Sequence, residues 1–153
     1  MPIEIDPWPY RAAMLRLAVS ILHHPQNAED AVSQAMLQAL RRSHTLRDPS
    51  AIKPWLLKIT ACCAYDLLRR EKRRAALPEF EPSAAPFCAP QDSLFAQLCC
   101  LSPPFAQVLT LYYYENLSTA EIASVLAIPP ATVRRRLSHA RDQLKTLLQE
   151  EDG

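Results

Sequence analysis

The sequence predicts an all-α protein made of two small helical domains joined by a proline-rich linker. The sequence has fourteen prolines and one glycine, Gly153. The lack of other glycines excludes glycine hairpins, phosphate-cradling loops and dinucleotide-binding fingerprints. Apolar residues recur every three or four positions, and few β-branched runs alternate as a strand requires. Four prolines crowd into residues 78–92, where no helix persists. We therefore expect domains at residues 1–77 and 93–153.

The composition is that of a folded chain. Hydrophobic residues make up 49% of the 153 positions and charged residues 22%, which supports about one domain or two small ones. No apolar run reaches the roughly 18 residues of a membrane span, and the N-terminus lacks a signal-peptide pattern. We expect a cytoplasmic protein without membrane insertion.

Charge is distributed unevenly along the chain. Residues 1–77 carry a net charge of +5, residues 78–100 carry −3 and residues 101–153 carry −1. The bases gather in two clusters, within Arg69–Arg74 and at Arg134–Arg136. A single cluster would indicate no more than a solvated helix end. Two separated clusters favour a polyanion that is contacted at two places.

The first domain is expected to contain three helices. The first spans about residues 8–23 and ends near Pro25. Asn27 is expected to cap the second, which runs to about Arg42 with Glu29 and Asp30 in its first turn. The buried residues predicted for this second helix are Ala31, Met36, Leu37 and Leu40.

A third helix is expected over about residues 51–74, ending in the first basic cluster. Asp66 is expected to pair with an arginine one turn later, Arg69 or Arg70. The residues expected in the core are Ile52, Trp55, Leu56, Ile59, Leu67 and one of Cys62 and Cys63.

The second domain has the pattern of a helix-turn-helix. Ser118 and Glu121 form a capping box that begins a short helix. The prolines after Ile128 stop that helix, and Pro130 suits the first turn of the next one. Ala127 must adopt a left-handed conformation or force a different turn. The stripe expected to be buried in the last helix is Val133, Leu137, Ala140, Leu144 and Leu148.

A polar and mostly basic face lies beside that stripe. Measured from Val133, its members fall at about 80° to 140° around the helix: Arg134, Ser138, Arg141 and Lys145. A short helix, a tight turn and a second helix with polar side chains at its start form the geometry that enters a DNA major groove.

The five cysteines occur as Cys62–Cys63, Cys88 and Cys99–Cys100. The spacing lacks the C-x-x-C of zinc sites, and an odd count without a secretory signal argues against a disulfide framework. We expect ordinary buried thiols. The pattern predicts no metal, no cofactor and no catalytic nucleophile–base pair.

The order and spacing of these motifs resemble the extracytoplasmic-function (ECF) sigma factors, the two-domain minimal members of the bacterial sigma family. The resemblance covers nearly the whole chain, and its motifs are Asn27–Val32, Trp55–Ile59, Asp66–Arg70, Leu117–Ala123, Thr132–Leu137 and Ala140–Arg141.

The resemblance implies an alternative sigma factor that performs no covalent chemistry. Its partners would be core RNA polymerase, promoter DNA and an anti-sigma factor. The implied polymerase contacts are Asp30, Ser33, Gln34, Gln38 and Arg41. The implied contacts to the −10 element are Lys53, Trp55, Lys58, Cys62, Arg69, Arg70 and Arg73. The implied contacts to the −35 element are Thr132, Arg134, Arg135, Ser138, His139 and Arg141.

Two alternatives remain open. The family usually has Gln-Glu-Thr-Phe where this chain has Ser33-Gln34-Ala35-Met36, which favours a stand-alone helix-turn-helix regulator with lost or altered polymerase dependence. The cysteines allow a redox or metal sensor within the sigma framework.

Overall fold

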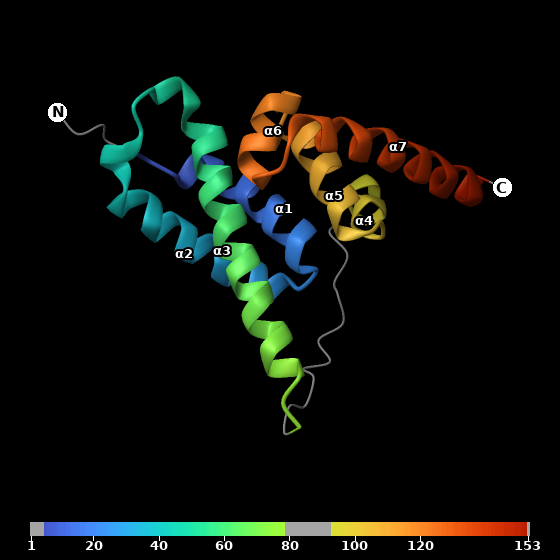
Figure 1. Cartoon of the computed structure of the whole chain (residues 1–153), viewed down its shortest axis with the longest axis horizontal. Coiled ribbons are helices and arrows are strands. Elements are labelled where there is room, and N and C mark those ends of the chain that lie inside the picture. The colour runs from blue at the N-terminus through green and yellow to red at the C-terminus, as the bar shows by residue number, and fades with distance from the viewer. Residues whose placement is uncertain (1–4, 79–92, 153) are drawn as a thin grey trace. The chain divides into compact units, whose positions relative to one another are not determined.

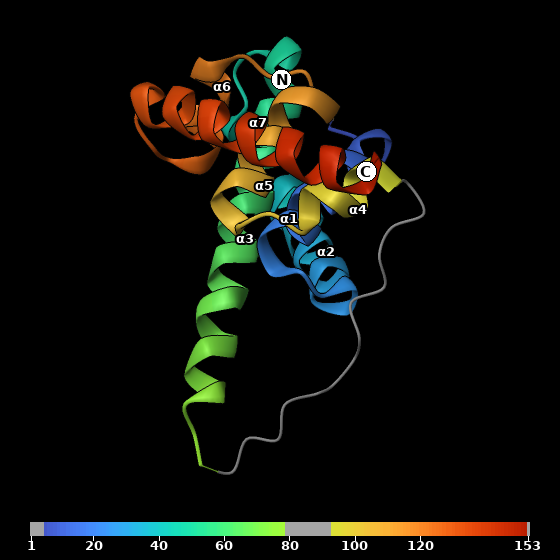
Figure 2. The same ribbon diagram turned by 90° about the vertical axis from the view of Figure 1, so that its right-hand side faces the viewer.

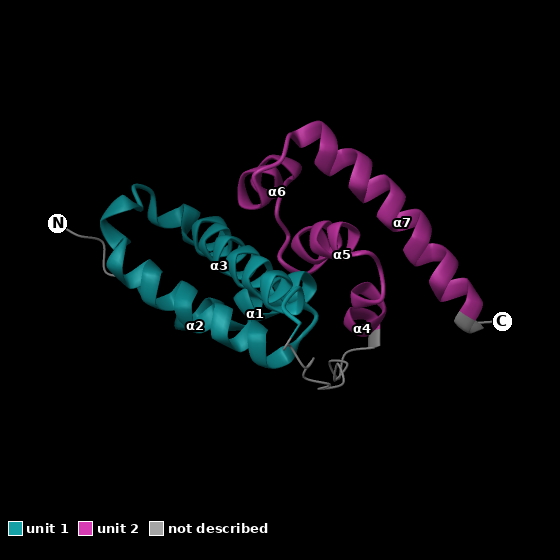
Figure 3. Ribbon diagram, turned by 60° about the horizontal axis from the view of Figure 1, so that its bottom comes forward, with its two compact units in different colours: residues 1–88 teal, residues 89–153 magenta. Residues whose placement is uncertain are grey.

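The computed structural model describes residues 5–78 and 93–152. Within those ranges every long regular element is a helix (Figure 1), so the all-α prediction is confirmed. The chain divides into two compact units, residues 1–88 and 89–153 (Figure 3). The predicted linker, apart from Pro78, and Cys88 lie outside the described residues.

Unit 1 is built on three helices that pack against one another. Its elements in chain order are η1 (Trp8–Tyr10), α1 (Arg11–Leu22), α2 (Pro25–Arg41), η2 (Ser43–Thr45), η3 (Pro49–Ala51) and α3 (Ile52–Ala75). The C-terminal half of α3 extends past α1 and α2 (Figure 2), and residues 72–78 are exposed.

Small residues form the buried face of α2. Four alanines line it together with Val32, and each is at most 1% exposed: Ala28, Ala31, Ala35 and Ala39. Because an alanine side chain is only a methyl group, it takes up little space between helices. This face therefore lets α1 and α3 pack close to the backbone of α2. The predicted burial of Leu37 and Leu40 is wrong, since they are 49% and 54% exposed. Met36 is half-buried.

The start of α2 also differs from the prediction. The helix begins at Pro25, and His24 caps it by accepting the Asn27 N–H on its ring Nδ1 at 3.2 Å. A proline ring fixes the backbone for a first helical position, so the helix begins before Asn27. Asn27 is therefore no cap, and Glu29 and Asp30 lie beyond the first turn.

α3 buries less of its apolar surface than predicted. Leu56, Ile59 and Cys63 are buried, whereas Cys62 is exposed. Three residues expected in the core are only half-buried, namely Ile52, Trp55 and Leu67. Ile52 and Leu67 share the buried side of α3 but lie nearer its two ends, and Trp55 lies at the edge of that side.

Unit 2 packs three shorter helices along one long helix (Figure 3). Its elements are α4 (Ser93–Cys99), α5 (Pro103–Leu109), the π-helical turn η4 (Thr110–Tyr114), α6 (Thr119–Leu126) and α7 (Pro130–Asp152). Val133, Leu137 and Ala140 of α7 are buried, as predicted. Leu144 is half-buried and Leu148 is 36% exposed, because the last turns of α7 run beyond the core.

The helix-turn-helix forms as its sequence predicts. The Ser118 hydroxyl accepts the Glu121 N–H at 3.1 Å, and the Glu121 carboxylate accepts the Ser118 N–H at 3.0 Å. Ala127 takes the left-handed conformation with φ 56°. The Pro129 carbonyl then accepts the Thr132 and Val133 N–H groups at 3.0 and 3.2 Å, which begins α7 at Pro130. These contacts fix the angle between α6 and α7.

Replacing Ala127 by glycine should stabilise unit 2. A Cβ in the left-handed region costs about 1 kcal/mol, and Ala127→Gly removes it. The matched control is Ala120→Gly in the regular, exposed part of α6, which should lower stability by roughly 0.5–1 kcal/mol. Hydrogen exchange of the α6 and α7 amides in the full chain measures both changes. Equal effects of the two substitutions would contradict the left-handed turn.

Unit 1 should lose stability as the pH falls below 6.5, the ordinary pKa of histidine. Burial lowers the pKa of His23 in the native state, so the unfolded chain binds more protons over this range and unfolding becomes easier. His23→Asn tolerates the φ of 52° found here and should flatten the pH dependence. Tryptophan fluorescence during urea unfolding reports on unit 1, which holds both Trp8 and Trp55. Identical pH profiles for the two proteins would exclude His23 as the cause.

Candidate functional site

The outer face of α2 combines polar and apolar side chains. Asp30, Ser33, Gln34 and Arg41, predicted to bind a partner, are exposed, and Gln38 is half-buried. Leu37 and Leu40 lie on the same outward side, about 180° and 120° around the helix from Ala28. Sequence analysis missed these two leucines, although the alanine stripe on the opposite face predicts their exposure.

An apolar groove borders this face. It is a shallow hollow of about 710 Å³ lined by Ile5, Asp6, Pro7, Trp8, Met36 and Leu40. Trp8 is 68% exposed. The Arg11 guanidinium lies 5.9 Å from the centre of the Trp8 ring and 3.6 Å from the Glu29 carboxylate. That arginine therefore connects the N-terminal turn to α2.

A stripe of mostly polar and basic side chains follows α3. Members spaced three or four residues apart share one side of the helix over about 27 Å: Trp55, Lys58, Cys62, Asp66, Arg69 and Arg73. Arg70 borders this stripe. Lys53, half-buried, falls about 160° from Trp55 around the helix. The structure thus places six of the seven residues predicted for −10 contact along one side of α3 and leaves Lys53 apart.

Asp66 organises part of this stripe. Its carboxylate lies 3.0 Å from the Arg70 guanidinium and 3.6 Å from that of Arg69, which confirms the predicted pairing. Both arginines are more than half exposed, so each keeps donors directed at solvent. Exposed pairs of this kind contribute little stability, and they mainly orient the two guanidinium groups.

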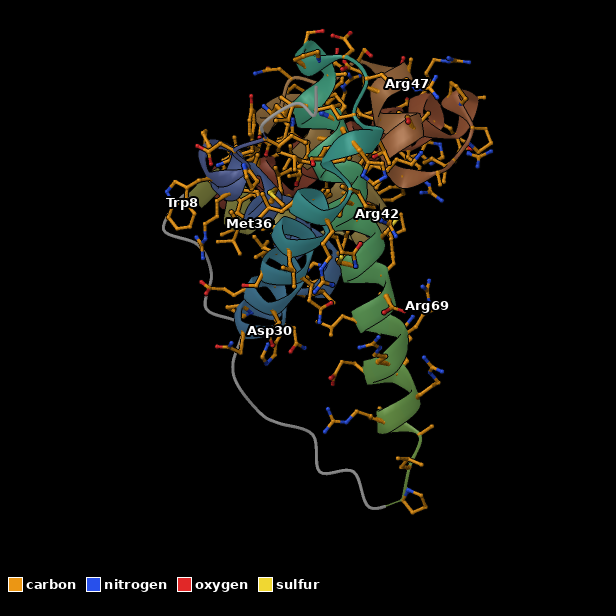
Figure 4. All side chains as sticks on the ribbon, turned by 90° about the vertical axis from the view of Figure 1, so that its left-hand side faces the viewer. Trp8, Asp30, Met36, Arg42, Arg47 and Arg69 are labelled. Atoms are coloured by element: carbon orange, nitrogen blue, oxygen red, sulfur yellow. The ribbon has the colours of Figure 1, made fainter. Side chains whose placement is uncertain are left out.

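Two further arginines in the connection before α3 were missed by sequence analysis. Arg42 and Arg47 are exposed, and Figure 4 shows Arg42 beside α3, with Trp8 and Met36 on the other side of the unit. The connection is fastened by Asp48, whose carboxylate accepts the Ser50 N–H and hydroxyl at 3.0 and 2.8 Å. These hydrogen bonds lower the pKa of Asp48.

The N-terminal half of α7 carries the residues predicted for −35 contact. Arg134, Arg135, Ser138 and His139 are exposed, and Thr132 is half-buried. The His139 ring meets Phe105 of α5 edge to face at 6.4 Å between centroids, which limits its movement. The capping box begins α6, and the left-handed turn at Ala127 then directs the chain into α7. Together they set where the start of α7 lies within the helix-turn-helix.

Arg141 of α7 contacts two tyrosines of η4. Its Nε donates a hydrogen bond to the Tyr113 hydroxyl at 2.9 Å. Its guanidinium carbon lies 5.1 Å from the centre of the Tyr112 ring and 5.8 Å from that of Tyr113. The hydrogen bond raises the pKa of Arg141, and the two rings fix the orientation of its planar group.

The structure bears out the expectation of buried thiols at two of the four described cysteines, including one of the pair Cys62 and Cys63. Cys63 and Cys99 are buried, but Cys62 and Cys100 are exposed. Burial raises the pKa of Cys63, and it raises that of Cys99 to about 11, so both thiols stay protonated. Over residues 5–78 and 93–152, no three metal-ligating side chains come together, and none of the helices described there is long and apolar enough to cross a membrane.

Both halves of the chain match known families. Residues 9–74 match sigma-70 region 2, and residues 91–144 match sigma-70 region 4. RNA polymerase sigma factor SigV of Bacillus subtilis is 29% identical over 141 residues, covering 90% of this chain and 85% of SigV. ECF RNA polymerase sigma factor SigM of Mycobacterium tuberculosis is 29% identical, covering 87% of this chain and 70% of SigM.

A third relative is much longer than this chain. The probable RNA polymerase sigma factor RfaY of Xanthomonas campestris is 30% identical over 146 residues, and the match covers 86% of this chain and 36% of RfaY. Among solved structures, the sigma factor RpoE from Bartonella quintana, crystallised with the anti-sigma factor NepR, has the same fold. Its TM-score is 0.76 at 22% identity, over 94% of both chains. The chain therefore belongs to the sigma-70 family, as an RNA polymerase sigma factor of the ECF type.

Proposed function

We propose that this ECF sigma factor uses three separate surfaces to start transcription. The outer face of α2 binds core RNA polymerase, the stripe on α3 holds the opened −10 strand, and the start of α7 recognises the −35 element. The observation that carries the proposal is the exposure of Leu37 and Leu40 beside the polar residues of α2. A regulator that binds only DNA does not require an exposed apolar surface on α2.

The α2 face has the composition of a protein-binding surface. Two half-exposed leucines lie among short polar side chains, with Arg41 at one end and Asp30 at the other. Interfaces depend on a few apolar anchors surrounded by a polar rim. The groove at Trp8, Met36 and Leu40 continues the apolar part of this face.

The α3 stripe suits a single DNA strand. Cationic side chains spaced over about 27 Å can follow a backbone of phosphates. Trp55 is half-buried, so part of its ring remains available for stacking on an unpaired base. Arg42 and Arg47 add charge in the connection that precedes α3. A cationic surface with an aromatic ring stabilises separated strands.

The start of α7 suits duplex DNA. In a helix-turn-helix, the N-terminal residues of the second helix reach base edges in the major groove. Arg134 and Arg135 are exposed there, and an arginine can bind a guanine edge with two hydrogen bonds. Thr132, Ser138 and His139 are the other α7 residues proposed to contact nearby bases or phosphates.

An anti-sigma factor is the partner proposed to regulate this protein. Two solved structures with the same fold are of sigma factors bound to such partners, RpoE with NepR and CnrH with the cytosolic domain of CnrY. A partner that covers the exposed leucines of α2 would block polymerase binding directly.

Replacing both exposed leucines should weaken polymerase binding. Leu37→Ala with Leu40→Ala removes two apolar anchors, and we expect at least a tenfold loss in affinity for purified core RNA polymerase. Leu77→Ala is the matched control, because that leucine is 60% exposed and lies beyond α3. Fluorescence anisotropy at a fixed salt concentration measures all three proteins. Wild-type affinity in the double variant would exclude α2 as the docking face, and absence of wild-type binding would favour the stand-alone regulator.

Removing the two arginines at the start of α7 should weaken −35 recognition and spare polymerase binding. Arg134→Ala with Arg135→Ala should cost at least tenfold in holoenzyme affinity for a −35 duplex selected from a random library. Gln143→Ala with Thr146→Ala, exposed in the second half of α7, is the control. Unchanged DNA affinity in the arginine variant would show that α7 is not the recognition helix.

A further inference from the structure

We propose that Tyr113, Arg141 and Lys145 form a binding site for a backbone phosphate of duplex DNA, distinct from the base-reading residues of α7. The inference rests on the proposed −35 recognition and assigns different tasks to the start and to the middle of α7. Arg134 and Arg135 would select sequence, whereas the Tyr113–Arg141–Lys145 site would fix how far α7 enters the groove.

The Arg141 guanidinium is already oriented in the free protein. The Tyr113 hydroxyl accepts a hydrogen bond from Nε at 2.9 Å, and the rings of Tyr112 and Tyr113 lie 5.1 and 5.8 Å from the guanidinium carbon. Tyr112 adds a weaker side-chain hydrogen bond to the one with Tyr113. The guanidinium has five N–H donors, so its terminal nitrogens retain donors for a phosphate oxygen. A guanidinium held this way loses little side-chain entropy when it binds.

The tyrosine and the lysine supply further donors at the same place. A shallow groove of about 380 Å³ is lined by Tyr113, Arg141, Leu144, Lys145, Leu148 and Gln149. While its oxygen accepts from Arg141, the Tyr113 O–H can donate to a phosphate oxygen. Lys145 follows Arg141 by one turn and is exposed. Three kinds of donor thus border one hollow, and within that hollow no carboxylate opposes an anion.

The position along α7 distinguishes phosphate from bases. Arg141 lies seven residues after Arg134, which is about 10 Å along the helix axis. In a helix-turn-helix, the N-terminal residues of the second helix are the ones that contact base edges. Because Arg141 lies farther along α7, we expect it beyond the bases, beside the phosphates that border the groove. Arg134 and Arg141 share one side of the helix, about 20° apart, so both face the DNA together.

The site also touches the start of the helix-turn-helix. Tyr112 and Tyr113 line a second hollow with Asn116, Leu117, Ser118 and Glu121, at the beginning of α6. The first helix of such a motif crosses the DNA backbone. The η4 turn thus places Tyr113 between α6 and Arg141, where the backbone would pass.

Salt dependence tests the proposal with reconstituted holoenzyme. DNA affinity is measured between about 50 and 200 mM salt on the selected −35 duplex, where each phosphate contact contributes about 0.9 to the slope of log affinity against log salt. Arg141→Ala should lower the slope by about 0.9, reduce affinity about fivefold to tenfold, and leave the selected sequence unchanged. Tyr113→Phe keeps the ring and the charge, so it should reduce affinity twofold to fivefold at an almost unchanged slope.

The control is Gln143→Ala with Thr146→Ala. Both residues are exposed on α7, on a side of the helix well away from Arg141. This double variant should leave the salt slope and the affinity unchanged. Arg141→Lys retains the charge and guards against misfolding, and it should keep the slope with weaker binding.

Three results would overturn the proposal. A wild-type slope and affinity in a folded Arg141→Ala protein would exclude the phosphate contact. A changed sequence preference would make Arg141 a base-reading residue. If Arg134→Ala with Arg135→Ala also leaves DNA binding intact, the proposed −35 recognition fails as well, which separates the two failures.

Discussion

Close packing of α2 through its alanine face is the constraint on which the surface of unit 1 depends. Four alanines and Val32 occupy the inner side of that helix, and methyl groups hold its backbone near α1 and α3. The large side chains that a core would normally take are therefore turned outward. Leu37 and Leu40 become surface anchors for this reason, and the proposed polymerase site follows from the core rather than from any special loop.

Unit 2 depends on a comparable local constraint. The chain makes the turn between α6 and α7 without glycine, so Ala127 adopts a left-handed conformation at φ 56°. The Ser118–Glu121 capping box and the Pro129 carbonyl secure the two helix starts on either side of it. The strained conformation of Ala127 thus sets the orientation of α7, the proposed recognition helix. Direct base recognition requires such a fixed orientation.

The surfaces proposed to bind DNA in the two units have one structural feature in common. In each, an arginine is oriented by a neighbour within the same unit, Arg70 by the Asp66 carboxylate at 3.0 Å and Arg141 by the Tyr113 hydroxyl at 2.9 Å. Orientation in the free protein lowers the entropy lost on binding. A carboxylate competes with phosphate for the arginine, whereas a tyrosine does not. Arg141 is therefore the better prepared of the two.

Local patterns determined the helical class, the capping box and the basic clusters, because each depends on neighbours within a few residues. Of the two conformations that the sequence left open at Ala127, the structure has the left-handed one. The sequence alone did not determine how deeply other apolar residues are buried: Leu148 is 36% exposed, and Cys62 lies outside while Cys63 lies inside. Nor did it reveal that Arg141 meets Tyr113, 28 residues away along the chain. Only tertiary packing decides such matters, since burial and long-range pairing depend on which helices meet.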